Sequence, residues 1–128
     1  MFPPIFPTIS ASSAVKAIIG GPPNATRFYQ FGMAPDNVQY PYAVWRRVFG
    51  APENYLGDMP GIDQFTVQVD CYARGDSSGA NTVRNLAAAI RDAIEPVSYI
   101  TNWLGESIDP ETKSHTFTFQ CDWYVNRP

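Results

Sequence analysis

The chain has 128 residues, which suits one domain, and a domain of this length buries enough surface to fold without a metal ion or a disulfide. Its composition is 45% hydrophobic, 14% aromatic and 16% charged, which excludes an intrinsically disordered protein. The net charge of -3 argues against stable binding of nucleic acid, because proteins of that class carry a surplus of basic residues.

The first half of the chain is expected to hold a helix and two strands. Apolar residues recur at helical spacing over residues 8–19, and Thr8 or Ser10 is suited to cap this helix. The glycines and prolines of residues 20–23 end it, because glycine suits the position after a helix and proline cannot continue one. A short strand is expected over residues 27–31, a loop over 32–41, a strand over 42–49, and a proline- and glycine-rich loop over 50–61.

The clearest strand pattern covers residues 63–73, where apolar and polar residues alternate strictly. The apolar positions are Phe65, Val67, Val69 and Cys71, and the polar positions are Gln64, Thr66, Gln68 and Asp70. Because successive side chains of a strand point to opposite faces, one face is expected on the core and the other in water or against another subunit.

After a turn at residues 75–79, an amphipathic helix is expected to run to about residue 95, where Pro96 ends it. Its apolar stripe consists of Val83, Leu86, Ala87, Ile90 and Ile94. A hairpin then follows, with strands over 99–105 and 115–125 and a turn at 109–112. The sequence therefore predicts a single α+β domain over residues 1–128, in which two amphipathic helices pack on one face of a mostly antiparallel sheet of four to five strands.

No catalytic or metal-binding motif accompanies these elements. His115 is the only histidine, and it lies on the polar side of its strand, so we expect no Ser-His or Cys-His mechanism. Cys71 and Cys121 occupy apolar positions of two strands and are expected to be buried, reduced thiols. Two cysteines and one histidine fall short of a zinc site, and no phosphate-binding loop occurs, so no cofactor is expected.

One enzyme hypothesis stays open. Asp70 and Asp122 lie on the polar faces of two strands, and two converging carboxylates are the minimum for a small hydrolase of the glycosidase type. A second alternative is a monomeric ligand-binding domain with an aromatic pocket. No apolar run approaches the length of a membrane span, and the proline-interrupted start is not expected to be a secretory signal.

Three stretches form a larger pattern when they are taken in order. They are Arg27-Phe28-Tyr29 with Met33-Ala34-Pro35, then Tyr40-Pro41-Tyr42-Ala43-Val44-Trp45-Arg46-Arg47-Val48, then residues 65–73 with Leu86 and Ala93-Ile94 of the following helix. Together with an N-terminal helix and a final aromatic strand, this order resembles the tail completion, or tail terminator, proteins of long-tailed bacteriophages. The resemblance covers most of the chain and departs from it in the proline-rich start and in the long connection after Pro96.

This resemblance implies a structural role in virion assembly and no enzymatic activity. Such proteins are α+β subunits of a hexameric ring at the head-proximal end of the tail tube, where the ring stops tube polymerisation and offers a docking surface to the head. The implied partners are further copies of the chain, the tail tube protein and a head–tail connector or neck protein. DNA would pass through the lumen without specific binding, and the protein would be found in the virion tail and, during assembly, in the host cytoplasm. Another small neck or connector subunit is the alternative within the same class.

Candidate interface residues follow from composition. Phe2, Ile5 and Phe6 are apolar, and the three prolines of residues 1–7 are expected to forbid a helix, so this arm is expected to dock on a neighbouring subunit. Further candidates lie in the 42–49 strand and the 50–61 loop. They are Tyr42, Arg46, Arg47, Tyr55 and Asp58.

Overall fold

The computed structural model describes residues 4–20, 25–55 and 58–126, and for residues 51–55 and 58–61 it describes the backbone alone. The helices are α1 (Ile5–Ser10), α2 (Ser13–Ile19) and α3 (Gly79–Ile94). The strands are β1 (Phe28–Gln30), β2 (Tyr42–Tyr55), β3 (Asp58–Ala73), β4 (Tyr99–Ile108) and β5 (His115–Asn126).

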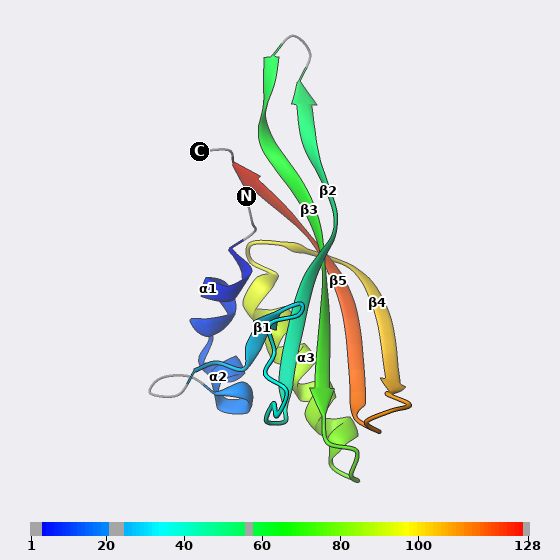
Figure 1. Ribbon diagram of the computed structural model, residues 1–128. Helices are drawn as coiled ribbons and strands as arrows, with labels where there is room; N and C mark the ends of the chain where they lie inside the picture. The colour runs from blue at the N-terminus through cyan, green and yellow to red at the C-terminus, as the bar shows by residue number, and fades with distance from the viewer. Residues whose placement is uncertain (1–3, 21–24, 56–57, 127–128) are drawn as a thin grey trace.

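The five strands form one sheet in the order β1-β2-β3-β5-β4. The short strand β1 runs parallel to β2, and every other neighbouring pair is antiparallel. The predicted α+β class is therefore confirmed, with a sheet that is mixed through its first strand. The β2–β3 hairpin projects well beyond the rest of the sheet (Figure 1).

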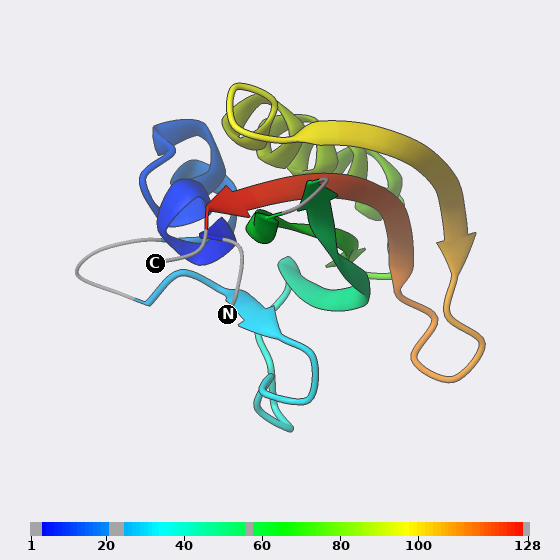
Figure 2. The same ribbon diagram turned by 90° about the horizontal axis from the view of Figure 1, so that it is seen from above.

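All three helices lie on one face of the sheet (Figure 2). Helix α3 packs on β3 and β5, and α1 and α2 pack against α3. The predicted stripe of α3 is confirmed, since all five of its residues are buried. The apolar face of β3 is confirmed as well, since Phe65, Val67, Val69 and Cys71 all belong to the core. The strict two-residue alternation of β3 and the apolar stripe of α3 therefore determine which face of the strand packs on which face of the helix.

The N-terminal segment differs from the prediction in two ways. Residues 8–19 do not form one helix, because Ser12 adopts an extended conformation and its Oγ accepts a hydrogen bond from the Val15 amide, which begins α2. The expectation that the prolines forbid a helix was wrong, since α1 includes Pro7. This proline lies in the first turn, where a backbone N–H has no partner within the helix and its loss costs little.

The expected loop at residues 50–61 was also wrong. Its described backbone continues both strands of the hairpin, and Pro52 pairs with Asp63. Strand β1 pairs only with Ala43–Trp45, so the outer edge of β2 beyond Trp45 has no strand beside it among the described residues. A proline is tolerated at such an edge, because its missing N–H removes no ladder hydrogen bond there.

Candidate interaction surfaces

The sheet face opposite the helices carries two clusters of hydrogen-bonded polar side chains. Thr66 Oγ1 donates to Asp122 Oδ1 at 2.7 Å, and Thr118 Oγ1 donates to Asp70 Oδ1 at 2.8 Å. Amide side chains extend each pair into a cluster of its own. They are Gln64, Gln68, Gln120 and Asn102, each within 3.4 Å of a polar neighbour. The sequence predicted a polar face here, and the structure adds that its groups bond mainly to one another.

The register of β3 and β5 separates the two candidate catalytic acids. Asp70 lies opposite Thr118, whereas Asp122 lies opposite Thr66, four residues further along β3. Four residues of strand span about 13 Å, and the paired carboxylates of glycosidases lie about 5–9.5 Å apart. Because each acid also accepts a hydrogen bond from a threonine, the geometry does not support the hydrolase hypothesis.

Both cysteines are free and buried, as predicted. The same register places Cys71 opposite Phe117 and Cys121 opposite Val67, so the two thiols are also four residues apart along the strands, too far for a disulfide. Burial raises the pKa of both thiols, and that of Cys121 rises to about 11 although Trp123 Nε1 donates to its sulfur at 3.2 Å. These are inert core residues rather than nucleophiles.

Four tyrosines gather where β2 begins. The Tyr42 ring stacks on Tyr72 with the centroids 4.9 Å apart, and Tyr40 and Tyr29 pack beside it. Burial, followed by the neighbouring tyrosines and Asp109, raises the pKa of Tyr42 to about 12. The candidate interface residue Tyr42 therefore lies half-buried within an aromatic cluster of its own subunit.

The two adjacent arginines of β2 point to opposite sides of the sheet, as expected for neighbours in a strand. Arg46 lies opposite Gln68 of the polar face, and Arg47 lies opposite the buried Val67. The Arg46 guanidinium lies 5.9 Å from the centre of the Phe31 ring, and that of Arg47 lies 5.3 Å from the Phe65 ring. Both side chains are exposed.

The other candidates from the sequence are spread along the chain. Ile5 is fully buried in the core of its own subunit, whereas the neighbouring Phe6 is 45% exposed. Phe2 lies outside the described residues, and so do the side chains of Tyr55 and Asp58, whose backbones belong to the hairpin. The structure thus leaves Phe6 as the exposed member of the N-terminal set.

Exposed large apolar residues concentrate at the two edges of the sheet. Of the eleven among the described residues, four lie at the edge formed by β1 and β2, and six lie along β4 and beside it. The first edge group, called here the β2 edge, consists of Phe31, Met33, Val48 and Phe49. The second, called the β4 edge, consists of Val97, Tyr99, Trp103, Leu104, Ile108 and Tyr124. Figure 2 shows β1 and β4 on opposite sides of the molecule.

The sequence reasoning missed the β4 edge. Apolar and polar residues do not alternate over β4. In the structure this irregular sequence coincides with register shifts at Thr101 and Leu104. Such bulges turn side chains of one strand away from their regular positions, so an unpatterned strand with Trp103-Leu104 was the available signal of an exposed apolar edge. The bulges also interrupt the row of free backbone groups by which another strand would add to this edge.

A cleft of about 730 Å³ adjoins the β4 edge where α3 turns into β4. Its lining combines aromatic, apolar and acidic side chains: Glu95, Pro96, Val97, Ser98, Tyr99 and Tyr124. The rings of Tyr99 and Tyr124 meet edge to face, with their centroids 5.9 Å apart. The cleft therefore presents aromatic and apolar surface beside the carboxylate of Glu95.

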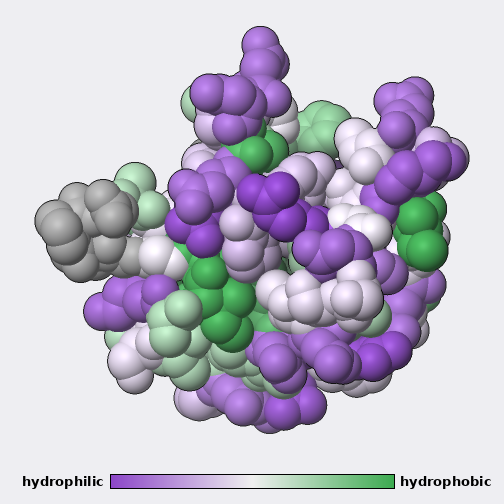
Figure 3. Space-filling view, turned by 90° about the horizontal axis from the view of Figure 1, so that it is seen from below, coloured by the Kyte–Doolittle hydropathy of each residue, from purple (hydrophilic) through white to green (hydrophobic). Residues whose placement is uncertain are grey.

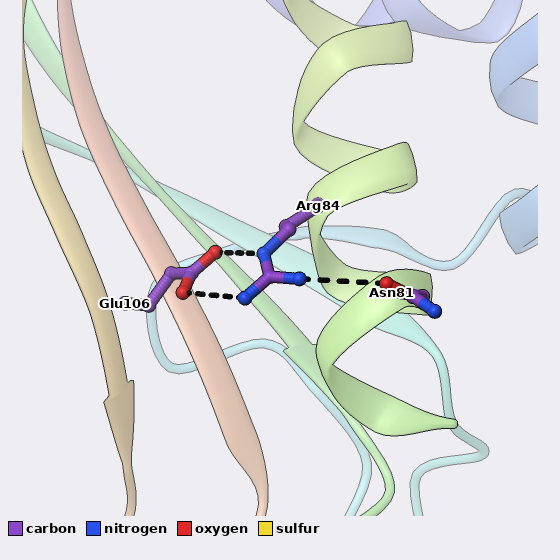
Figure 4. A network of polar contacts seen from close by, with 3 residues as sticks. All are labelled: Asn81, Arg84 and Glu106. Atoms are coloured by element: carbon purple, nitrogen blue, oxygen red, sulfur yellow. Dashed lines mark hydrogen bonds and ion pairs between the residues drawn. The ribbon is translucent and has the colours of Figure 1, made fainter. Parts of the chain in front are cut away.

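An ion pair connects helix α3 to β4. The Arg84 guanidinium donates to both carboxylate oxygens of Glu106 and also to Asn81 (Figure 4). The pair lowers the pKa of the Glu106 carboxyl, mainly through the hydrogen bonds. A bidentate pair fixes the orientation of two side chains, and this one joins the edge strand to helix α3.

The lower end of the molecule in Figure 1, seen from below in Figure 3, is mostly hydrophilic. No group of three or more His, Cys, Asp and Glu side chains within the described ranges can hold a metal ion. None of the described helices has both the length and the apolar character needed to cross a membrane. The features that stand out are therefore the two apolar edges, the cleft and the polar face.

Comparisons with known proteins bear on the family and the fold of the chain. The family model described as "Tail completion protein gp17" matches residues 3–126. Among solved structures, the chain is similar to the one titled "Structure of bacteriophage SPP1 gp17 protein", with a TM-score of 0.54 and 8% identity over 96% of this chain and 86% of that chain. At this identity the likeness concerns the fold. No curated protein matches the chain.

Proposed function

We propose that this chain, which belongs to the family of tail completion protein gp17, forms a ring that caps the head-proximal end of a phage tail tube. Family membership gives the chain a structural role in the completion of a bacteriophage tail. The ring, the arrest of tube growth and the docking of the head are the finer parts of the proposal. Its subunits are further copies of this chain, six in number by analogy with the hexameric tail terminators that the sequence resembles.

The ring is proposed mainly because two apolar edges lie on opposite sides of the sheet. A monomeric protein rarely keeps large apolar patches in water, and such patches mark sites of association. Two different patches on opposite sides favour head-to-tail contacts, in which each copy uses one edge to bind the other edge of the next. Head-to-tail contacts produce a ring when the rotation between copies closes, and a ring matches the end of a tube.

The polar face of the sheet suits the lumen of this ring. Among the described residues of β3 and β5 that point away from the helices, two are carboxylates, Asp70 and Asp122, and none is cationic. The β3 and β5 part of this wall offers no positive charge to bind phosphates and therefore lets DNA move past it, and the one cation beside it among the described residues, Arg46 of β2, lies over the Phe31 ring at the margin of the face. The remaining surfaces, including the projecting hairpin and the exposed Phe6, are left for the tail tube on one side of the ring and for a head–tail connector or neck protein on the other.

Complementation in extracts tests this function. Purified chain is added to an extract of infected cells that lack its gene, before the tubes have overgrown, and joined particles are counted by infectivity and electron microscopy. The proposal expects joining of tails to filled heads to be restored in proportion to added protein. A heat-unfolded sample of the same chain is the control. If intact chain restores nothing, the capping role is excluded, and if tails are of normal length before the addition, the chain is instead a neck component.

A further inference from the structure

The geometry points to one specific contact between copies of this chain: the β2 edge of one copy, led by Phe31 and Met33, docks in the cleft and along the β4 edge of the next. This inference rests on the proposed ring and names the two surfaces that close it. Ten of the eleven exposed large apolar residues among the described ones belong to these two edges, so a single kind of contact covers nearly all of them.

The shapes of the two edges differ in the way a docking pair requires. Phe31 and Met33 flank Gly32, which has φ +83°, and they form a turn directly after β1, where the Met33 amide donates to Gln30 O. They are 67% and 71% exposed, so this turn presents two large apolar side chains to water. The β4 edge offers a recess instead, the cleft that adjoins Val97, Tyr99 and Tyr124.

The charges are complementary as well. Arg46 lies over the Phe31 ring and carries a positive charge into the β2 edge. Glu95 lines the cleft and carries a negative charge into the β4 edge. When Phe31 docks, the Arg46 guanidinium beside its ring reaches the mouth of the cleft and forms an ion pair with the Glu95 carboxylate. A partly desolvated pair of this kind fixes the orientation of the contact.

Side-chain packing, rather than extension of the sheet, forms the contact. Register shifts interrupt both free edges, at Val48 in β2 and at Thr101 and Leu104 in β4. Bulged edges resist the addition of another strand. The same bulges leave Val48 and Leu104 exposed beside the regular edge residues, where each enlarges the apolar area of its patch.

Three variants test the contact by sedimentation of the purified chain over a range of concentrations. Met33→Glu blocks the projecting turn, and Val97→Glu blocks the cleft; both residues are exposed, so both variants are expected to fold. Each variant alone is expected to weaken self-association by about tenfold or more. Ala17→Glu, at an exposed position of α2 outside both edges, is the matched control and is expected to associate like the unchanged chain.

A mixture of the two blocking variants gives the most specific test of the contact. Met33→Glu keeps an intact cleft and Val97→Glu keeps an intact turn, so their equimolar mixture is expected to form a dimer of one copy of each, which cannot extend. Arg46→Glu and Glu95→Arg are expected to weaken association singly and to restore it when combined in one chain. The contact is wrong if the unchanged chain stays monomeric up to its solubility limit, if either blocking variant alone assembles normally, or if the mixture stays monomeric. Such a result leaves the proposed function standing wherever the extract experiment still restores joining.

Discussion

Val69 of β3 lies directly opposite Phe119 of β5, and neither side chain is exposed to solvent. The pair lies at the centre of the core beneath α3, whereas the neighbouring Gln68 points to the polar face and lies opposite Gln120. Two adjacent residues of one strand thus have opposite environments, and the first prediction depends on this difference.

Val69→Asp is expected to unfold most of the protein. It places a carboxylate among apolar side chains without a partner, and the cost of several kcal/mol is a large part of a typical stability of about 5–15 kcal/mol. Gln68→Lys is the matched control, since a lysine there reaches water and the Asp70 carboxylate, which Gln68 Nε2 now contacts at 3.2 Å. Urea unfolding followed by circular dichroism measures both. Equal midpoints for the two variants would show that the assigned register is wrong.

Removal of the Ile5 side chain is expected to destabilise the domain, and removal of the Phe6 side chain is not. Ile5 is fully buried, so Ile5→Ala leaves a cavity that costs about 2–5 kcal/mol. Phe6→Ser changes an exposed residue and is expected to stay within about 1 kcal/mol of the unchanged chain. Thermal unfolding distinguishes the two. A stability loss of similar size in Phe6→Ser would place its ring in the core.

Phe6→Ser also tests the role of the N-terminal segment in assembly. If Phe6 contacts a partner in the tail, the folded variant is expected to restore joining in extracts less efficiently than the unchanged chain. Full activity of the folded variant would remove Phe6 from the candidate interface.

The stability of the protein is expected to fall as the pH rises from about 9 to about 11. Burial raises the pKa of Cys121 from the ordinary 9.0 of a thiol to about 11, so the unfolded chain loses this proton at lower pH than the folded chain does. The stabilisation is therefore complete below pH 9 and is lost as the pH passes through the folded value. Cys71, Tyr42 and Tyr72 shift in the same direction and add to the loss.

Cys121→Ala isolates the contribution of this thiol. The variant retains the other three groups, so the difference in stability between the unchanged chain and the variant is expected to shrink between pH 8 and pH 10.5. Urea midpoints at the two pH values measure it, and a reductant is expected to change neither. A difference that is independent of pH would show that the Cys121 thiol titrates alike in both states.

Breaking the Arg84–Glu106 pair is expected to loosen the β4 edge without unfolding the domain. Glu106→Gln keeps the size of the side chain and removes its charge, and both partners are exposed, so the loss of stability is expected to be small and to vanish in high salt. The hydrogen bonds from Arg84 lower the pKa of Glu106, so any stabilisation is present above the ordinary carboxyl range and is lost as the pH falls through the folded value. Amide hydrogen exchange in β4, compared at low and high salt, measures the effect. Unchanged exchange would show that the pair does not hold the strand.

The elements that could be predicted from the sequence are those whose residue pattern is compatible with only one buried face. The α3 stripe and the alternation of β3 each fit one face only, so the buried faces of this helix and this strand were predicted correctly. The 50–61 segment was mistaken for a loop because its prolines and glycines are turn-forming locally, whereas pairing between two long strands extends the hairpin through them. Ile5 was assigned to an interface because only the tertiary packing of α1 shows that it belongs to the core.

The candidate surfaces were harder to predict for a physical reason. An interface residue is defined by exposure, and exposure depends on which strand is at the edge of the sheet. The strand order β3-β5-β4 places Trp103 and Leu104 at an edge, and no local pattern in the sequence determines that order. Adjacent residues of a strand must point to opposite sides, so the sequence alone separates Arg46 from Arg47, but only the structure shows that both side chains are exposed.

Tail length in the absence of this protein tests the central claim most directly. Cells infected with a phage that lacks the gene are lysed, and tail lengths and attachment to heads are measured by electron microscopy. If the chain caps the tube, tails are expected to be overlong or irregular in length and to lie apart from filled heads, because head-to-tail addition of tube subunits has no end of its own. Tails of normal length joined to filled heads in that lysate would contradict the capping role.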